Sequence, residues 1–276
     1  MSLPALDHLV LDVGEDLDDA ASTYRALGFH LTDRGHHTLG SSNHLAMFAT
    51  NYLELLSPGP SGGAIRPELA GFPPGLNGLV FATDDADARH RDLLARGVDV
   101  RDPQSFSRPV TLTDGTTADA RFRTTHLSRS EVPFGRLYFC QHFTRDLVWR
   151  PEWQRHPNGA QEITGLMMSA EQPAVVASLF TRMFDAEPSQ SGAGRLTFSA
   201  GSTSLEILPR AEAARQLGDA MPAPSNRPAF IALIRLKTAS LRETQKTIAA
   251  PTRLLSDRSL LVPARAAGNV AIAFAE

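Results

Sequence analysis

Polar and apolar residues alternate through residues 6–13, which predicts a strand with one buried face. Leu9 and Leu11 lie on one face of that strand, and His8 and Val10 lie on the other. A helix that follows is expected to cover the first face. We therefore expect His8 to point into the space that the sheet encloses.

The next segments complete a unit of one strand, one helix and three further strands. Residues 16–27 begin with acidic side chains and end before a glycine, which is typical of a helix. Strands are expected near residues 29–33, 45–49 and 52–56, the last of which stops before a proline. Only this unit has a histidine in its first strand.

The same order can be followed three more times along the chain. The opening strand LDHLV at residues 6–10 is echoed by LNGLV at 76–80, ITGLM at 163–167 and FIALI at 230–234. A repeat of this length is a supersecondary unit, and one copy alone leaves one face of its sheet bare. The four units should therefore pair.

Length and the repeat together favour two domains. A chain of 276 residues suits one large or two ordinary domains, and the repeat is most strongly interrupted around Trp149 and Trp153. Tryptophans at this spacing anchor a linker or contact a ligand, and we prefer an ordered connection packed on the first domain. The predicted divisions are a first domain at 1–146, a linker at 147–161 and a second domain at 162–276.

Composition and charge exclude several classes of function. The formal net charge is −3 with both signs interspersed, so no basic stripe for nucleic acid is expected. No apolar run is long enough to cross a bilayer, and the first residues do not have the pattern of a signal peptide. The single cysteine, Cys140, cannot form an intramolecular disulfide. We expect a cytoplasmic protein that binds neither nucleic acid nor membrane.

With these motifs in order, the chain resembles the vicinal oxygen chelate superfamily, which includes glyoxalases, bleomycin resistance proteins and extradiol dioxygenases. The resemblance rests on LDHLV at 6–10, SSNH at 41–44, YLELL at 52–56, FCQH at 139–142 and HPNGA at 156–160. It implies an α+β fold in which four βαβββ units form two paired-module, glyoxalase-like domains. Their mixed sheets would curl around a central cavity.

The resemblance also implies a divalent metal in the first cavity, held by the first and last strands of two paired units. Carried over by position, the ligands would be His8, Glu54 and, at the end of the last strand of unit two, His142. The first strand of unit two has Gly78 where a ligand is expected, and Asn77 beside it should face the other way. Two histidines and a carboxylate suit iron, manganese, zinc or nickel.

Glu54 would also be the catalytic carboxylate. Further residues are candidates for contacting a small ligand at the cavity: Asn43, His44, Arg121, Arg123 and Trp149. A plainer interpretation stays open, in which His8 is an ordinary hydrogen-bonded residue and Glu54 pairs with one of the arginines, because buried carboxylates need a partner. His36 and His37 follow a glycine and are interpreted as a solvated turn.

The second half lacks the histidine and is interpreted as a degenerate copy. Gly165 stands at the position of His8, whereas Glu206 is retained. Two functions therefore remain for the whole chain. The first is a metal-dependent lyase, isomerase or oxygenase acting on a small oxygenated molecule. The second is a sequestering protein without chemistry or metal, which the vacant position at Gly78 favours. Either a monomer or a homodimer is compatible with four units.

Overall fold

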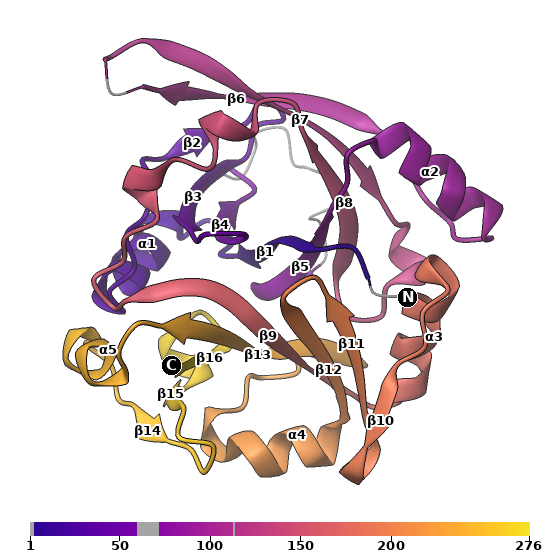
Figure 1. Ribbon diagram of the computed structural model, residues 1–276, viewed down its shortest axis with the longest axis vertical. Helices are drawn as coiled ribbons and strands as arrows, with labels where there is room; N and C mark the ends of the chain where they lie inside the picture. The colour runs from indigo at the N-terminus through magenta and orange to yellow at the C-terminus, as the bar shows by residue number, and fades with distance from the viewer. Residues whose placement is uncertain (1–2, 60–71, 113) are drawn as a thin grey trace.

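The computed structural model describes residues 3–59, 72–112 and 114–276, which form two eight-stranded mixed sheets flanked by helices (Figure 1). The strand order is β2-β3-β4-β1-β5-β8-β7-β6 in the first sheet and β10-β11-β12-β9-β13-β16-β15-β14 in the second. Each sheet is assembled from two units that meet side by side through their first strands. The predicted fold class of paired βαβββ units is confirmed.

The elements of the first sheet follow the predicted order. Unit one comprises β1 (Leu6–Asp12), α1 (Leu17–Ala26), β2 (Gly35–His36), β3 (Ser42–Met47) and β4 (Tyr52–Ser57). Unit two comprises β5 (Gly75–Ala82), α2 (Ala86–Ala95), β6 (Gln104–Thr111), β7 (Thr117–His126) and β8 (Arg136–His142). The strand expected at residues 29–33 is instead irregular chain, because Phe29 and Leu31 fill the core there without a ladder of hydrogen bonds.

The second sheet repeats this arrangement. Unit three comprises β9 (Ala160–Ala170), α3 (Pro173–Phe184), β10 (Ser189–Ser191), β11 (Arg195–Ala200) and β12 (Thr203–Pro209), followed by α4 (Arg210–Leu217). Unit four comprises β13 (Ala229–Thr238), α5 (Leu241–Thr247), β14 (Arg253–Leu254), β15 (Leu260–Val262) and β16 (Ala271–Ala275). Local signals fix two of these helices, since Ser240 accepts a hydrogen bond from the Glu243 N–H at the start of α5 and Pro173 begins α3.

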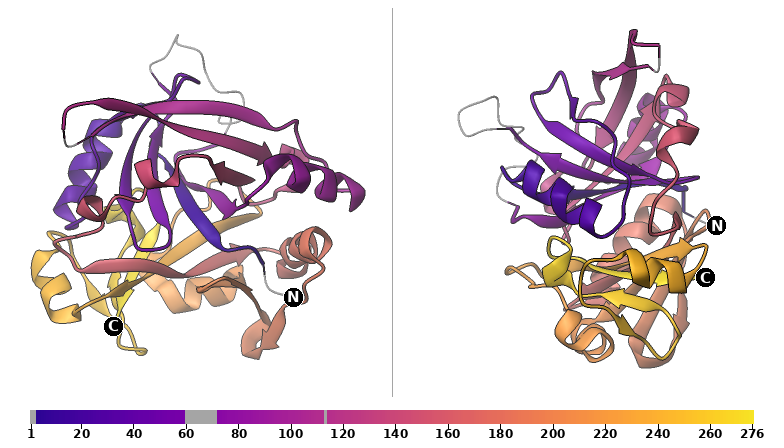
Figure 2. Two further views of the ribbon diagram at one scale, coloured as in Figure 1. Left: turned by 45° about the horizontal axis from the view of Figure 1, so that its top comes forward. Right: turned by 90° about the vertical axis from the view of Figure 1, so that its left-hand side faces the viewer.

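The two halves stack on one another and share a hydrophobic core (Figure 2). Phe81 of β5, for example, lies with its ring centre 6.3 Å from that of Phe180 and 5.5 Å from that of Phe184 on α3. Each sheet also has a separate apolar cluster on its other face. The boundaries predicted between the domains stay a prediction.

The connection between the halves is an ordered part of the structure. The Asn158 N–H donates to the Gly28 carbonyl and its side-chain amide donates to the Leu27 carbonyl, at the end of α1. The Asn158 carbonyl in turn accepts from the hydroxyls of Thr238 and Thr244. This one residue therefore ties α1 to the α5 region. Among the helices of the described residues, none has the length and apolar character needed to cross a bilayer.

Candidate metal and ligand site

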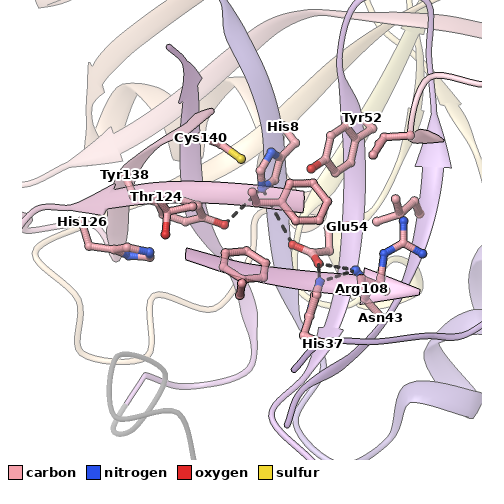
Figure 3. A pocket seen from close by; sticks show the side chains of 14 residues that line it. His8, His37, Asn43, Tyr52, Glu54, Arg108, Thr124, His126, Tyr138 and Cys140 are labelled. Carbon is pink, nitrogen blue, oxygen red and sulfur yellow. Dashed lines mark hydrogen bonds and ion pairs between the residues drawn. The ribbon is translucent and has the colours of Figure 1, made fainter. Parts of the chain in front are cut away.

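The first sheet encloses a narrow cavity beside β1, β4 and β8, with side chains from β3, β6 and β7 completing its wall (Figure 3). The lining consists of His8, His37, Asn43, Leu45, Tyr52, Glu54, Phe106, Arg108, Phe122, Thr124, His126, Tyr138, Cys140 and Val148. The space open to the centre of a water molecule is about 30 Å³. This space suits a few water molecules, so a ligand that is much larger has to displace side chains as it enters.

A β-bulge turns two consecutive side chains of β1 toward this interior. The register between β1 and β5 shifts between Leu6 and His8, so Asp7 is the extra residue. The His8 Nδ1 lies 2.6 Å from Asp7 Oδ1, and its Nε2 lies 3.1 Å from the Tyr138 hydroxyl. An ionised carboxylate only accepts hydrogen bonds, so Nδ1 carries the proton. The lone pair of Nε2 therefore faces the cavity.

Glu54 meets that lone pair from β4. Its Oε2 lies 3.8 Å from His8 Nε2, while its Oε1 accepts a hydrogen bond of 2.6 Å from the Asn43 amide. The His37 Nε2 lies 3.9 Å from the same Oε1. Because Glu54 is only 6% exposed, these polar contacts supply the partners that a buried carboxylate needs.

A second cluster lies on the opposite edge of the His8 ring. Asp7 Oδ1 also lies 3.1 Å from His142 Nε2, which in turn lies 3.5 Å from Cys140 Sγ. One donor atom from each of these three residues lies within 4.8 Å of the others, so they could hold a metal ion. Burial alone would raise the pKa of Asp7, but the charge of His142 and hydrogen bonds from both imidazoles outweigh it and hold that pKa well below its usual range.

The strand register explains which positions of the repeat face the cavity. In unit one, Val10 lies two residues after His8 and pairs with Glu54; it also pairs with Gly78 of unit two. In unit two, Val80 lies two residues after Gly78 and pairs with Tyr138. Gly78 is therefore equivalent to His8 in the repeat, and Tyr138 is equivalent to Glu54. A Cβ added at Gly78 would lie 2.6 Å from the Val10 Cβ, so the missing ligand is replaced by packing.

The three predicted metal ligands do not lie together in the structure. The structure brings His8 and Glu54 together, but it places His142 on the Nδ1 side of His8, beyond Asp7. His142 is not among the described side chains that line the cavity. Asn77, expected to face away from the cavity, lies in a second bulge and accepts hydrogen bonds from Arg136.

Of the predicted ligand contacts, Asn43 lines the cavity and the others do not. His44 faces the other side of β3, where its Nδ1 lies 2.8 Å from the Thr32 carbonyl. Arg123 lies on the outer face of β7 and binds both carboxylate oxygens of Asp87, at 2.8 and 2.7 Å. Arg121 is exposed on that same outer face. The alternation of β7 instead turns uncharged or weakly basic side chains inward: Phe122, Thr124 and His126.

Trp149 lies just behind the cavity. Its ring packs edge-on against Tyr52 at 5.4 Å and against His142 at 5.1 Å, and the Arg145 guanidinium lies 3.4 Å from the ring centre. The predicted packing of this tryptophan on the first half is thus seen, and its contact with a ligand stays a prediction.

The sequence interpretation missed several polar residues of the site, including Asp7, Tyr138, His37 and Arg108. Asp7 was missed because a bulge has no pattern of its own, and Tyr138 because only the register shows its equivalence to Glu54. His37 was assigned to a solvated turn, yet its side chain is 7% exposed and faces Glu54. The inward direction of Arg108 could have been predicted from the sequence, since Arg108 alternates with other residues along β6 and shares its inner face with Phe106 and Val110.

The corresponding residues of the second half form ion pairs instead. Glu206 Oε1 lies 2.8 Å from Arg195 Nη1, and its Oε2 lies 3.7 Å from Arg235 Nη2. Arg235 packs over Gly165, the position equivalent to His8. Guanidinium groups therefore supply the positive charge beside this carboxylate, which fits the interpretation of a degenerate copy.

Paired βαβββ units with an inward histidine and glutamate define a protein of the vicinal oxygen chelate type. The chain belongs to the glyoxalase-like domain family, whose model matches residues 6–184. The predicted resemblance is confirmed by this match. No curated protein matches the sequence.

Solved structures share the fold at low sequence identity. A hypothetical protein from Staphylococcus aureus is similar with a TM-score of 0.68 and 13% identity, covering 99% of each chain. A variant of 4-hydroxymandelate synthase from Streptomyces coelicolor gives a TM-score of 0.57 at 10% identity, covering 91% of this chain and 76% of that one. A xylose isomerase-like TIM barrel/4-hydroxyphenylpyruvate dioxygenase fusion protein gives 0.56 at 14% identity, covering 92% and 40%.

Proposed function

We propose that the chain is a divalent-metal enzyme acting on a small oxygenated molecule, with His8 and Glu54 as metal ligands. The observation that carries this proposal is the approach of His8 Nε2 to within 3.8 Å of Glu54 Oε2 at the cavity wall. The donor set fits a metal, since both groups are buried and the other nitrogen of His8 is bonded to Asp7. Histidine ligands usually have such a carboxylate partner.

A bound divalent ion would act as a Lewis acid that polarises the oxygens of the substrate. The protein's own residues then have separate tasks. Asp7 orients His8, Asn43 holds Glu54, and the Tyr138 hydroxyl is the nearest proton donor to the Nε2 of His8. If a metal were held by Nε2, the Tyr138 hydroxyl would no longer donate to that nitrogen and would be placed at the cavity wall to donate to a substrate oxygen.

A sequestering protein without catalysis is the second candidate. It is favoured by Gly78, whose ligand position is filled by Val10, and by the hydrogen bond that already occupies Glu54. In both cases the partner is a small molecule. The predicted monomer or homodimer and the cytoplasmic location stay predictions.

The deciding experiment is the metal content of the purified protein, measured by elemental mass spectrometry. The double variant His8→Ala, Glu54→Ala is compared with the wild type and with Glu206→Ala, which removes the equivalent carboxylate of the second half. Near-stoichiometric metal in the wild type and in Glu206→Ala, lost in the double variant, supports the enzyme. Absence of metal from all three after iron, manganese, zinc or nickel is added back would overturn it.

A further inference from the structure

Arg108 is a buried cation on the cavity wall, and its guanidinium is not held by any hydrogen bond to the part of the chain that the structure describes. It lies on the inner face of β6, is 4% exposed, and is drawn near Asn43 and Glu54 (Figure 3). Within residues 3–59, 72–112 and 114–276, its guanidinium makes no hydrogen bond or ion pair, and its Nη2 is buried without a partner. This arrangement is unusual for arginine, which is seldom fully buried unless paired.

Among the residues that the structure describes, two other arginines are buried to a similar extent, and both are hydrogen-bonded. Arg136 donates to the Asn77 side chain, and Arg227 donates to the carbonyls of Pro224 and Leu76. Burial lowers the pKa of Arg108, and the nearby Tyr52 and Glu54 oppose that shift. Since a guanidinium stays protonated in proteins, the result is a fixed positive charge at the cavity with free donors.

The Arg108 side chain occupies space that is open because residue 35 is a glycine. A Cβ added at Gly35 would lie 2.5 Å from Arg108 Cδ and 2.8 Å from its Nη1. Any larger residue at 35 would push the guanidinium out of place. The close approach of β2 thus fixes where Arg108 points.

We propose that Arg108 binds the carboxylate group of the ligand, so that this cavity selects small carboxylate-bearing molecules. The inference rests on the proposed use of the cavity as the ligand site. A planar carboxylate matches the forked guanidinium with two parallel hydrogen bonds. A phosphate dianion fits less well, because the cavity is narrow, Arg108 is its only arginine among the described lining residues, and Glu54 would repel a second negative charge. Phe106 and Phe122 would contact the apolar part of the molecule.

The test uses formate and acetate as probes, titrated calorimetrically into full-length protein with a metal chelator present. Sodium chloride at equal ionic strength serves as the reference salt, and formamide and acetamide serve as neutral probes of the same shape. The wild type is expected to bind the carboxylates saturably and the amides far more weakly. Arg108→Gln should weaken carboxylate binding roughly ten- to hundredfold, and Arg108→Lys should weaken it less.

Arg123→Gln is the matched control, because Arg123 belongs to the same sheet but lies on its outer face, away from the cavity, where it is paired with Asp87. Its carboxylate binding should equal that of the wild type. The proposal is overturned if the wild type binds no more carboxylate than chloride, if Arg108→Gln binds as well as the wild type, or if Arg123→Gln loses as much. Circular dichroism verifies folding, and Arg108→Lys provides the comparison if the glutamine variant is unfolded. Because no metal is present, this result is independent of the metal measurement that tests the proposed function.

Discussion

Val10 occupies the space in which a side chain at position 78 would have to lie. The Val10 Cβ would be 2.6 Å from a Cβ on Gly78, and its Cγ2 would be 2.9 Å away. A Cβ cannot move without its backbone, so the contact is rigid. The vacant ligand position of the repeat is therefore closed by packing between two neighbouring strands.

Restoring a histidine at this position should destabilise the protein before it improves metal binding. We expect Gly78→His to lower the free energy of unfolding by about 2 kcal/mol or more, because the new side chain overpacks a closed site. Urea unfolding monitored by circular dichroism measures this loss.

The double variant Val10→Gly, Gly78→His tests the same contact in the other direction. Because glycine removes the Cβ that a side chain at 78 would meet, this variant should recover part of the lost stability and should bind zinc more tightly than the wild type does. Equal stability of Gly78→His and the wild type would show that the two strands can separate, contrary to the packing argument.

Asp7 is expected to hold His8 in the orientation that binds metal. Asp7→Asn keeps the shape of the side chain but removes the charge that both His8 and His142 contact. We expect zinc affinity to fall about 10- to 100-fold, as is usual when the partner of a histidine ligand is changed. Competition with a chromogenic chelator measures the affinity.

The control for this effect is Asp12→Asn, at the other end of β1. Asp12 is buried as well, but it accepts hydrogen bonds from Gly14 and Asn77 rather than from a histidine. Its zinc affinity should stay within about twofold of the wild type, on the expectation that distant sites act independently. Unchanged affinity in Asp7→Asn would remove Asp7 from the site.

Cobalt(II) distinguishes the two clusters that share Asp7. Burial raises the pKa of the Cys140 thiol well above its ordinary value, so the thiolate needed for coordination is disfavoured. We therefore expect cobalt-loaded protein to lack the near-ultraviolet charge-transfer band of a cobalt–thiolate bond. Cys140→Ser should retain its cobalt. A band in the wild type that disappears in Cys140→Ser would instead place the metal at Asp7, Cys140 and His142.

The architecture could be predicted from the sequence because the same local pattern of polar and apolar residues recurs in each unit. The four opening strands and the helices after them have the periodicity that defines such elements, and the inward face of His8 follows from alternation. Glu54 was predicted as the companion of His8, and the two do lie 3.8 Å apart. These features depend on period and order, which a single sequence contains.

The remainder of the site depends on register, which a single sequence does not contain. A shift of one residue moves a side chain to the other face. Bulges at Asp7 and Asn77 change the direction of two side chains without any change in the polar pattern. The register between β5 and β8 shows that the residue of unit two equivalent to Glu54 is Tyr138 rather than His142. Likewise, the Arg123 side chain points outward to its ion pair with Asp87, and the sequence alone does not indicate this pairing.

His156 makes the stability of the whole chain dependent on pH. Its Nε2 donates to the Met47 carbonyl at 2.8 Å, and its Nδ1 accepts from the His30 N–H at 3.0 Å. Burial lowers the pKa of His156 to about 4, although the bond to Met47 opposes that shift. Protonation would place an added proton against the His30 donor, so the neutral ring is required in the folded state.

The unfolded chain therefore takes up a proton near pH 6.5, while the folded chain does so only near pH 4. The unfolded state binds more protons between these values, so stability falls as the pH falls from about 6.5 to about 4, by about 3 kcal/mol in total. Asp7 adds no slope in this window, because its stabilisation is lost only below the ordinary pKa of an aspartate. His156→Gln should be less stable at pH 8 yet lose less stability on acidification, with a remainder from His44, whose pKa is also lowered by burial. Urea unfolding from pH 8 to pH 4 measures both curves, and parallel curves would show that another group titrates.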